Sequence, residues 1–444
     1  MLQSTREGLG QFWAKAFPNP RFYGWAIVGL SFLAATLSSP GQSFAISLFI
    51  EEIIATLDVS RMAVASLYGA MTLTAALCLP FVGGLADRIS GRAYLTINLL
   101  LLAMAIAFFG AVQNLVMLAL AFFFLRLLGQ GAIGLGTLTE IVRWFRRYRG
   151  RALAVGGLGY AFGELVFPIT IVTLVGLFGW RGALWSFSGV YLVVFVPLFF
   201  LLLRERRRDE SMDGIPGRAK LPERSGALLE TEKRDKQEEL GPEEEDGEES
   251  FTLKEALRMP LFWGLLVSVA VFPMVVTAVI FHQVALFEDR QWGLEAVPLS
   301  FMCFALAGVF TSYAAGILLE TRPVRAGLVV GMLLATVALL VAWGGDGSLG
   351  TSLIYGTLLG ASSGILTSTN ALIWPQYFGI EALGAIKGVV NGVRNGATAL
   401  GPPLVALLLG PEETFGLALL VLAILSLLPA LAAPLLRPPS RETS

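Results

Sequence analysis

Residues 83–92 read GGLADRISGR and connect two long apolar runs of the chain. A related stretch, GILLETRPVR, occupies residues 316–325 in the same setting. In each stretch three residues separate a glycine from an acidic residue, Asp87 in the first and Glu320 in the second, and an arginine follows. A repeat of this kind is typical of transporters built from two related halves, so the two stretches indicate that the chain contains an internal duplication.

A second correspondence between the halves supports the duplication. At a constant offset of 234 residues it pairs small or helix-bending residues with residues of the same kind. The pairs are Gly150 with Gly384, Ala154 with Gly388, and Pro168 with Pro402.

The runs around these motifs are long and apolar enough to cross a membrane. Hydrophobic residues make up 55% of the 444-residue chain and charged residues 15%, which is far from the composition of a soluble domain. About 20 apolar residues span a bilayer core. We predict an all-α integral membrane protein with twelve transmembrane helices in two pseudo-symmetric six-helix halves. The predicted spans cover residues 22–46, 60–85, 93–112, 115–141, 152–177, 182–203, 261–286, 297–319, 325–343, 349–376, 382–409 and 414–436.

Basic residues predict the orientation of the spans, because short cytoplasmic loops retain Lys and Arg. The loops on one side of the predicted bundle carry most of them, including the RWFRRYRGR stretch at 143–151. The loops on the other side hold Arg61, Arg181 and Arg290. We therefore expect a multi-pass protein of the cell's cytoplasmic membrane with both termini in the cytoplasm. The first apolar run is too long for a signal peptide, so we expect it to remain as the first span.

A charged segment divides the two halves. We predict an N-terminal half at 1–203, a cytoplasmic linker at 204–258 and a C-terminal half at 259–444. The acidic middle of the linker has almost nothing to bury, so it is either a solvated tether or a docking site for a regulator. Its last part, FTLKEALR, favours a short helix lying at the membrane interface.

The sequence offers no chemistry for an enzyme. Cys78 and Cys303 both fall inside predicted spans, and their spacing predicts neither a disulfide framework nor a metal site. Phosphate-binding loops and nucleophile motifs are absent from the sequence, so we expect no cofactor.

With these residues in view, the chain resembles the major facilitator superfamily over essentially its whole length. GGLADRISGR is similar to the signature loop of that family, although Ser90 stands where a glycine is usual. In that family an acidic and a basic residue lock the inner helix ends in one conformation. The resemblance therefore implies gating roles for the loop and for Glu140, which would be its partner. The implied gating residues are Gly83, Asp87, Arg88 and Glu140, with Glu320 and Arg322 in the second half.

Four further stretches resemble the monocarboxylate and oxalate-formate branch of the superfamily. They are FYGWAIV at 22–28, LDVSR at 57–61, RWFRRYRGRALAVG at 143–156 and ALRMPLFW at 256–263. This branch implies a small organic anion as the substrate.

Three charged residues lie deep inside predicted spans: Arg126, Glu164 and Arg394. Each is roughly a dozen residues from an aqueous end, which places it near the membrane midplane. A basic residue there costs about 2.5–3.5 kcal/mol on insertion scales unless water or a counter-ion meets it. Such residues mark substrate sites between the halves, so Arg394 is a candidate carboxylate ligand, and Glu164 with Arg126 is a candidate proton-coupling pair.

The residues leave alternatives open. Arg126 and Glu164 could simply neutralise each other as a structural pair. Arg394 could be met by Glu164, by backbone carbonyls or by an arriving anion. Glycines in the spans that hold Arg126 and Arg394 could serve rocking motions or static packing.

Polar residues elsewhere in the spans complete the candidate substrate site: Gln42, Asn370 and His282. His282 could equally be a polar residue at the membrane interface. Animal monocarboxylate transporters have a lysine where Gln42 stands and a charged pair in the eighth span, which here has none, so a lactate-like substrate is not implied. Oxalate-formate members have a basic residue in the eleventh span, which Arg394 resembles in location.

The sequence thus predicts a secondary transporter that moves a small organic anion by alternating access, coupled to protons or to anion exchange, and that works as a monomer in the lipid bilayer. The alternative is a proton-driven exporter of amphipathic drugs or metabolites, which would use the same Glu164 and Arg126 with an apolar pocket. A receptor on the same fold is a third reading.

Overall fold

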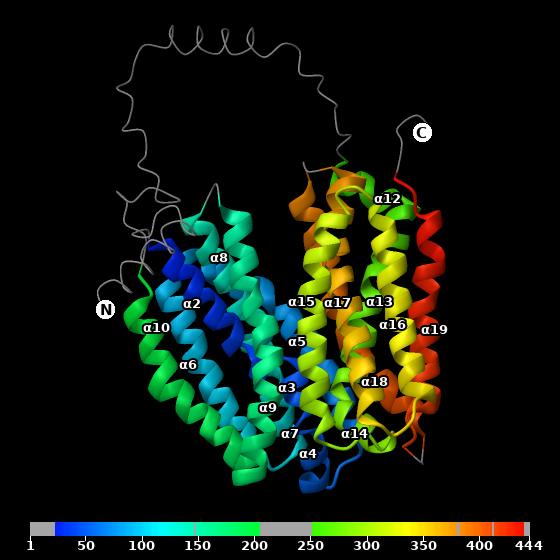
Figure 1. Ribbon diagram of the computed structural model, residues 1–444. Helices are drawn as coiled ribbons and strands as arrows, with labels where there is room; N and C mark the ends of the chain where they lie inside the picture. Colours follow the sequence, from blue (N-terminus) through cyan, green and yellow to red (C-terminus); the bar gives the residue numbers. More distant parts are fainter. Residues whose placement is uncertain (1–22, 146–147, 205–250, 380–381, 411–412, 439–444) are drawn as a thin grey trace, which may run out of the picture.

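The computed structural model describes residues 23–145, 148–204, 251–379, 382–410 and 413–438, and every regular element within them is a helix. Two helical bundles stand side by side (Figure 1). The first, here called the N bundle, is formed by residues 23–204. It contains α2 (Gly24–Leu37), η1 (Ser39–Gly41), α3 (Ser43–Ser47), α4 (Ile50–Leu57), α5 (Arg61–Arg88), α6 (Gly91–Gly110), α7 (Leu115–Leu125), η2 (Arg126–Ala132), α8 (Ile133–Trp144), α9 (Arg149–Val190), η3 (Tyr191–Phe195) and α10 (Val196–Leu202).

The second bundle, here called the C bundle, is formed by the described residues from 251 onward. It contains α12 (Leu253–Arg258), α13 (Pro260–Phe281), α14 (Gln283–Asp289), α15 (Ala296–Leu318), α16 (Val324–Gly344), α17 (Leu349–Phe378), α18 (Leu383–Leu409), α19 (Gly416–Ala432) and η5 (Ala433–Leu435). The end of the molecule where α10 ends and α12 begins is called the linker face, and the end that holds α4 and α14 is called the opposite face (Figure 1).

The short helix α12 forms where the sequence predicts an interfacial helix. The Thr252 side chain accepts a hydrogen bond from the Glu255 backbone, and the Glu255 side chain accepts one from the Thr252 backbone, which is a complete capping box. The Phe251 amide donates to the Phe378 carbonyl at 2.9 Å and so ties α12 to the end of α17. The charged linker that precedes it falls on residues 205–250, outside the described residues.

The helix lengths are consistent with twelve membrane spans. Within the described residues nine helices are long and apolar enough to cross a bilayer, or ten if the bent pair Gly24–Ser47 and Ile50–Leu57 is one span. One of the nine, Arg149–Leu202, has 54 residues, about twice the length that a span needs. Its chain reverses at Gly179, where φ is 68° and ψ is 168°, a backbone conformation that favours glycine. The remaining span is α18, which is 27 residues long but holds charged and polar residues.

The first span differs from the prediction, because residues 22–46 do not form one helix. Helix α2 ends at Leu37, and the chain passes through η1 before α3 begins at Ser43. Pro40 lies in this break and cannot donate a backbone hydrogen bond. Gly41 fills the break, and a Cβ atom added there would lie 2.6 Å from the Cα of Gly129 in η2. The break therefore lets the first span pack directly against the middle of the fourth.

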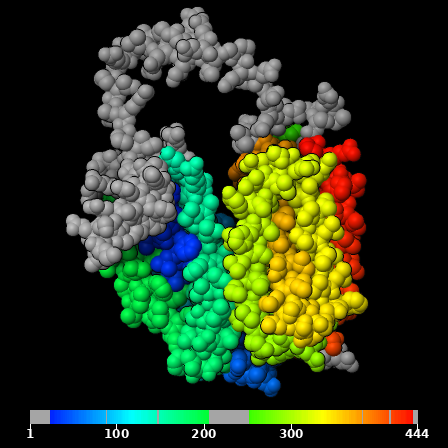
Figure 2. Space-filling model, viewed as in Figure 1, coloured from blue at the N-terminus to red at the C-terminus, as the bar shows by residue number. Residues whose placement is uncertain are grey.

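The two bundles are in contact near the opposite face. The rings of Tyr68 and Phe281 have centroids 4.5 Å apart, and those of Phe44 and Phe301 are 6.0 Å apart. Helix α5 approaches α18 so closely at Gly69 that an added Cβ would clash with the backbone of α18. Toward the linker face the surface is hollowed between the bundles, beside the teal segment of α8 and α9 and the yellow-green α15 (Figure 2). The molecule is thus sealed at one end and open at the other.

Candidate functional site

A cavity of about 730 Å³ lies between the two bundles. Its walls come from η1, α5, η2, α8 and α9 of the N bundle and from α18 of the C bundle. On the linker-face side it extends to Leu79 and Leu138, and the cross-bundle contacts close it at the other end. Its polar lining residues are Ser39, Gln42, Thr72, Arg126, Gln130, Tyr160, Glu164, Asn391, Arg394, Asn395 and Thr398.

Arg126 is held by the break in the first span. It begins η2, a π-helical segment in the middle of the fourth span, and its side chain is buried. One nitrogen, Nη1, donates to the Gly41 carbonyl at 3.0 Å and to Ser43 Oγ at 3.4 Å. Arg126 therefore satisfies a carbonyl in the irregular turn around Pro40. Its Nε and Nη2 are buried and have no hydrogen-bond partner among the described residues, and the guanidinium carbon lies 5.2 Å from the centroid of the Tyr68 ring.

Glu164 lines the cavity from α9. Small residues let this helix approach the first span closely. The Thr36 hydroxyl donates to the Gly159 carbonyl at 3.0 Å, and Gly163 leaves room for the Ser39 side chain. Among the described residues no ion pair joins Glu164 to Arg126. The alternative in which the two simply neutralise each other is therefore not the arrangement in this structure.

Arg394 lines the cavity from the facing wall, on α18. The residue as a whole is half-buried, whereas its Nε atom is buried and has no hydrogen-bond partner among the described residues. Within the part of the chain that the structure describes, no carboxylate forms an ion pair with it. Among the described residues, neither Glu164 nor a backbone carbonyl forms a hydrogen bond with it.

The structure adds polar residues that the sequence reasoning missed. Asn391, Asn395 and Thr398 line the cavity together with Arg394. They lie three residues before it and one and four residues after it, which is the spacing of one helix face. This spacing could have identified them in advance. Gln130 lies four residues after Arg126, and Tyr160 lies four residues before Glu164, so the same spacing rule could have identified them as well.

The other three predicted ligands divide into one that lines the cavity and two that lie elsewhere. Gln42 lines it, and its Nε2 donates to Ser38 Oγ at 3.4 Å. Asn370 is not among the lining residues, and its Oδ1 accepts a hydrogen bond from Trp374 Nε1 at 3.0 Å. His282 is also absent from the lining. It is buried, with Nε2 3.0 Å from the carbonyl of Pro402, the first of the paired prolines of α18.

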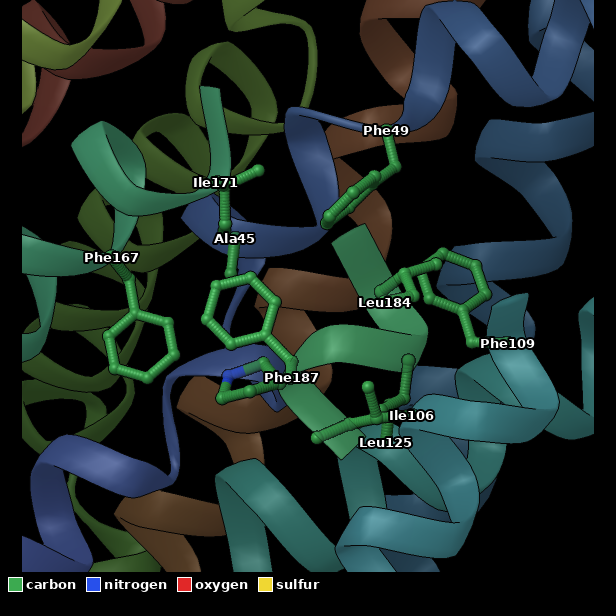
Figure 3. Close-up of a pocket in the computed structure, with 10 residues that line it drawn as sticks. Ala45, Phe49, Ile106, Phe109, Leu125, Phe167, Ile171, Leu184 and Phe187 are labelled. Atoms are coloured by element: carbon green, nitrogen blue, oxygen red, sulfur yellow. The ribbon is translucent and has the colours of Figure 1, made fainter. Parts of the chain in front are cut away.

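Two neighbouring cavities adjoin this one. An apolar crevice of about 750 Å³ lies between α9, α15 and α17 and shares Tyr160 and Glu164 with the central cavity. A smaller cavity of about 150 Å³ lies inside the C bundle and shares Arg394 with it. A further void, inside the N bundle, has a volume of only about 10 Å³. Figure 3 shows the side chains that line it, among them the phenyl rings of Phe49, Phe109, Phe167 and Phe187. That void is at the lower limit for a single water molecule and is a packing defect.

The loop between α5 and α6 is fastened to the linker-face end of α8. Arg143 donates to Glu140 Oε1 at 2.8 Å and to the Ala86 carbonyl at 2.8 Å. The Glu140 carboxylate lies against Gly91 at the N-terminus of α6, so closely that a Cβ there would clash with it. A carboxylate in this place interacts favourably with the positive end of the helix dipole.

The remaining predicted gating residues lie at the ends of α5 and α15 and in the turns that follow. Gly83 and Arg88 lie at the end of α5, while the side chain of Asp87 is outside the described part of the structure. In the C bundle, Glu320 and Arg322 are exposed, and the structure gives them no ion pair among the described residues. At the offset of 234 residues, Trp374 stands where Glu140 stands in the N bundle. The two linker-face loops are therefore built differently.

An ion-pair cluster at the opposite face joins the bundles. The buried guanidinium of Arg61 donates to Glu51 Oε2 at 2.9 Å within the N bundle. Its Nε and Nη2 both donate to Glu413 Oε2 of the C bundle at 3.1 Å. From the sequence, Arg61 is expected only to lie in a loop, because an ion-pair partner 352 residues away leaves no pattern in the residues around it.

The chain was compared with protein families and with solved structures. The family model of the Major Facilitator Superfamily matches residues 30–324 and 283–444. No curated protein matches the chain by sequence. Solved structures of membrane transporters share its fold, and three of them are described below; because their sequence identities to this chain are all below 20%, they show the fold alone.

Two of them are of a bacterial homolog of the human lysosomal transporter Spinster. The inward-facing, unoccupied form has a TM-score of 0.68 and 17% identity over 94% of this chain and 95% of that one. The inward-facing, occupied form has a TM-score of 0.71 and 15% identity over 94% and 97%. The nucleoside transporter NupG has a TM-score of 0.65 and 12% identity over 93% and 98%. The chain belongs to the Major Facilitator Superfamily and is a multi-pass membrane transporter rather than an enzyme.

Proposed function

We propose that the protein moves small organic anions of the monocarboxylate type across the cytoplasmic membrane by alternating access. The observation that carries this proposal is Arg394, half-buried in the cavity between the bundles and without a carboxylate partner among the described residues. A guanidinium binds a carboxylate through two parallel charged hydrogen bonds. A substrate carboxylate would supply the negatively charged partner that the described residues do not supply.

The rest of the cavity supports an anionic ligand. Arg126 lines the cavity from the N bundle, and its buried Nε and Nη2 have no hydrogen-bond acceptor among the described residues. The amide side chains of Gln130, Asn391 and Asn395 can donate hydrogen bonds without adding negative charge. The sequence motifs shared with the monocarboxylate and oxalate-formate branch agree with this reading.

Coupling and orientation complete the proposal. Glu164 is the carboxylate in the cavity lining, so proton uptake and release there can accompany transport, with anion exchange as the alternative. The linker face is the cytoplasmic face, because it carries the Arg-rich loops. In the state described here the substrate site is then open to the cytoplasm and sealed toward the outside.

Arg61 provides a latch for that sealed state, and replacing Glu413 should weaken it. Glu413→Gln removes the ion pair between the bundles, whereas Glu51→Gln removes only the pair within the N bundle and is the matched control. The Glu413 side chain is 55% exposed, so the pair stabilises the sealed state by only about 0.5–1 kcal/mol. We expect a shift of about two- to fivefold toward the outward-open state, measured as longer distances between spin labels on α4 and α14. Equal shifts in both variants would contradict a latch between the bundles.

A second prediction concerns the fastening of the α5–α6 loop. Gly91→Ala forces the Glu140 carboxylate away from the N-terminus of α6, which costs about 1–2 kcal/mol. Turnover should fall several-fold with little change in substrate affinity, because neither Gly91 nor Glu140 lines the cavity. Gly84→Ala is the control, since an added Cβ at Gly84 meets nothing within 4 Å. Normal turnover in a Gly91→Ala protein that is expressed and folded would exclude this loop from gating.

Uptake of labelled small carboxylates into proteoliposomes tests the proposed function. We expect accumulation that is saturable and driven by an imposed proton gradient or by a preloaded anion. The absence of uptake for every carboxylate in a panel of varied size, with protein shown to be folded, would overturn the proposal.

One observation favours a second candidate function, the proton-driven export of amphipathic compounds. The crevice of about 750 Å³ is mostly apolar, includes Phe304, Phe310 and Tyr313, and reaches Glu164. An exporter would raise the resistance of cells to amphipathic inhibitors, and Glu164→Gln would remove that resistance. An organic anion transporter would leave resistance unchanged.

A further inference from the structure

The cavity inside the C bundle lies outside the central cavity but borders it at Arg394. It has a volume of about 150 Å³ and lies between α13, α16 and α17. Protein interiors normally pack without voids of this size. The neighbouring helices are not held apart as a whole, since an added Cβ at Gly331 of α16 would lie 2.5 Å from the Leu366 side chain of α17. The space is therefore a local feature of an otherwise tight bundle.

Most of the walls of this cavity are apolar and buried, but Ser363, Thr367, Thr369 and Arg394 also line it. Val269, Phe272, Leu328, Met332 and Leu366 line it, and each is at most 7% exposed. The one buried polar wall residue, Thr369, already donates its hydroxyl to the Ile365 carbonyl at 2.8 Å. A cavity of about 150 Å³ has room for a ring of the size of benzene, and its buried apolar side chains would contact such a ring.

Arg394 connects this cavity to the proposed carboxylate site. It lines both the cavity of about 150 Å³ and the central cavity of about 730 Å³. Its Nε is buried and has no hydrogen-bond partner among the described residues. One residue thus stands between a polar chamber and an apolar space the size of a small ring.

We propose that the cavity beside Arg394 receives the apolar group of the transported carboxylate, so that the protein selects carboxylates with an aryl or short branched alkyl group over formate or acetate. This inference rests on the proposed function. The crevice of about 750 Å³ shares Ser363 and Thr367 with this cavity, but its walls include the exposed rings of Phe310 and Tyr313, whereas the large apolar side chains Phe272, Leu328 and Met332 of the smaller cavity are buried.

The test compares benzoate with acetate on the purified full chain. Val276 lines the cavity from α13, and Val276→Phe fills part of it. The matched control is Val267→Phe on the same helix, where the side chain is 61% exposed on the outside of the bundle. We expect the wild type to bind benzoate more tightly than acetate. Val276→Phe should weaken benzoate binding by about tenfold or more and leave acetate within about twofold. Val267→Phe should change neither.

The outcomes separate the two proposals. If the wild type binds neither ligand nor any larger carboxylate, the proposed function fails. If it binds both and Val276→Phe leaves their affinity ratio unchanged, the subsite fails and the carboxylate site stands. Should Val276→Phe not fold, Met332→Ala enlarges the same cavity. That variant is expected to raise the affinity for 2-naphthoate relative to benzoate, and an unchanged ratio would overturn the subsite.

Discussion

Arg394→Gln is expected to abolish the binding and uptake of carboxylates while the protein stays folded. The substitution removes the charge that would pair with the substrate, and it removes a buried guanidinium nitrogen, Nε, that has no hydrogen-bond partner among the described residues. Because an uncompensated charge in the membrane interior is destabilising, the thermal stability of the variant should equal or exceed that of the wild type. Arg394→Lys should retain some uptake with lower affinity, because the charge remains but the two-pronged geometry is lost.

A control on the same helix separates the effect of losing a positive charge from the effect of losing a residue in the cavity. Lys387→Gln makes the same charge change on α18 at a residue outside the cavity lining, whose Nζ donates to the Ala371 carbonyl at 3.4 Å. We expect its uptake to match the wild type. An Arg394→Gln protein that folds poorly, and whose folded fraction still binds carboxylates, would identify Arg394 as a structural residue.

Glu164→Gln is expected to abolish proton-driven accumulation and to preserve exchange of substrate across the membrane. Glutamine keeps the size and hydrogen-bonding capacity of the side chain but cannot take up or release a proton. Exchange between labelled and unlabelled substrate needs no net proton movement, so it should continue. Accumulation and exchange are measured in the same proteoliposomes, with and without an imposed pH gradient.

Glu52→Gln is the control for this experiment, because Glu52 is an exposed carboxylate on α4, outside the cavity. It should leave both activities intact. Proton-driven accumulation that survives Glu164→Gln would exclude Glu164 from coupling, and loss of both activities would point to a role in substrate binding or folding instead.

The spans and their order could be predicted from the sequence because they depend on local properties. A run of apolar residues long enough for the bilayer must be helical, since its backbone groups find no other partners there. The break at Pro40 depends instead on contact with a distant segment. The sequence permits a kinked helix at that position, but only the packing of Gly41 on Gly129 and the hydrogen bond from Arg126 explain the turn that forms.

The candidate site was predictable in part for the same reason. Charges at midplane depth stand out in any sequence, and Arg126, Glu164 and Arg394 do line one cavity. The surroundings of His282 could not be read, because its contact with the Pro402 carbonyl joins residues 120 positions apart. The latch between Arg61 and Glu413 was hidden likewise, since an arginine in a loop has no feature that distinguishes a partnered from a solvated side chain.

The most direct test of the account is a pair of ligands that differ only in charge. Benzoate and benzamide have nearly the same size and shape, but only benzoate offers a carboxylate to Arg394. The measurement is the thermal stability of the purified wild-type protein at increasing concentrations of each, because a ligand that binds the folded state raises its stability. We predict that benzoate stabilises the protein in a saturable manner and that benzamide does not. Equal stabilisation by both ligands would contradict an anion site at Arg394.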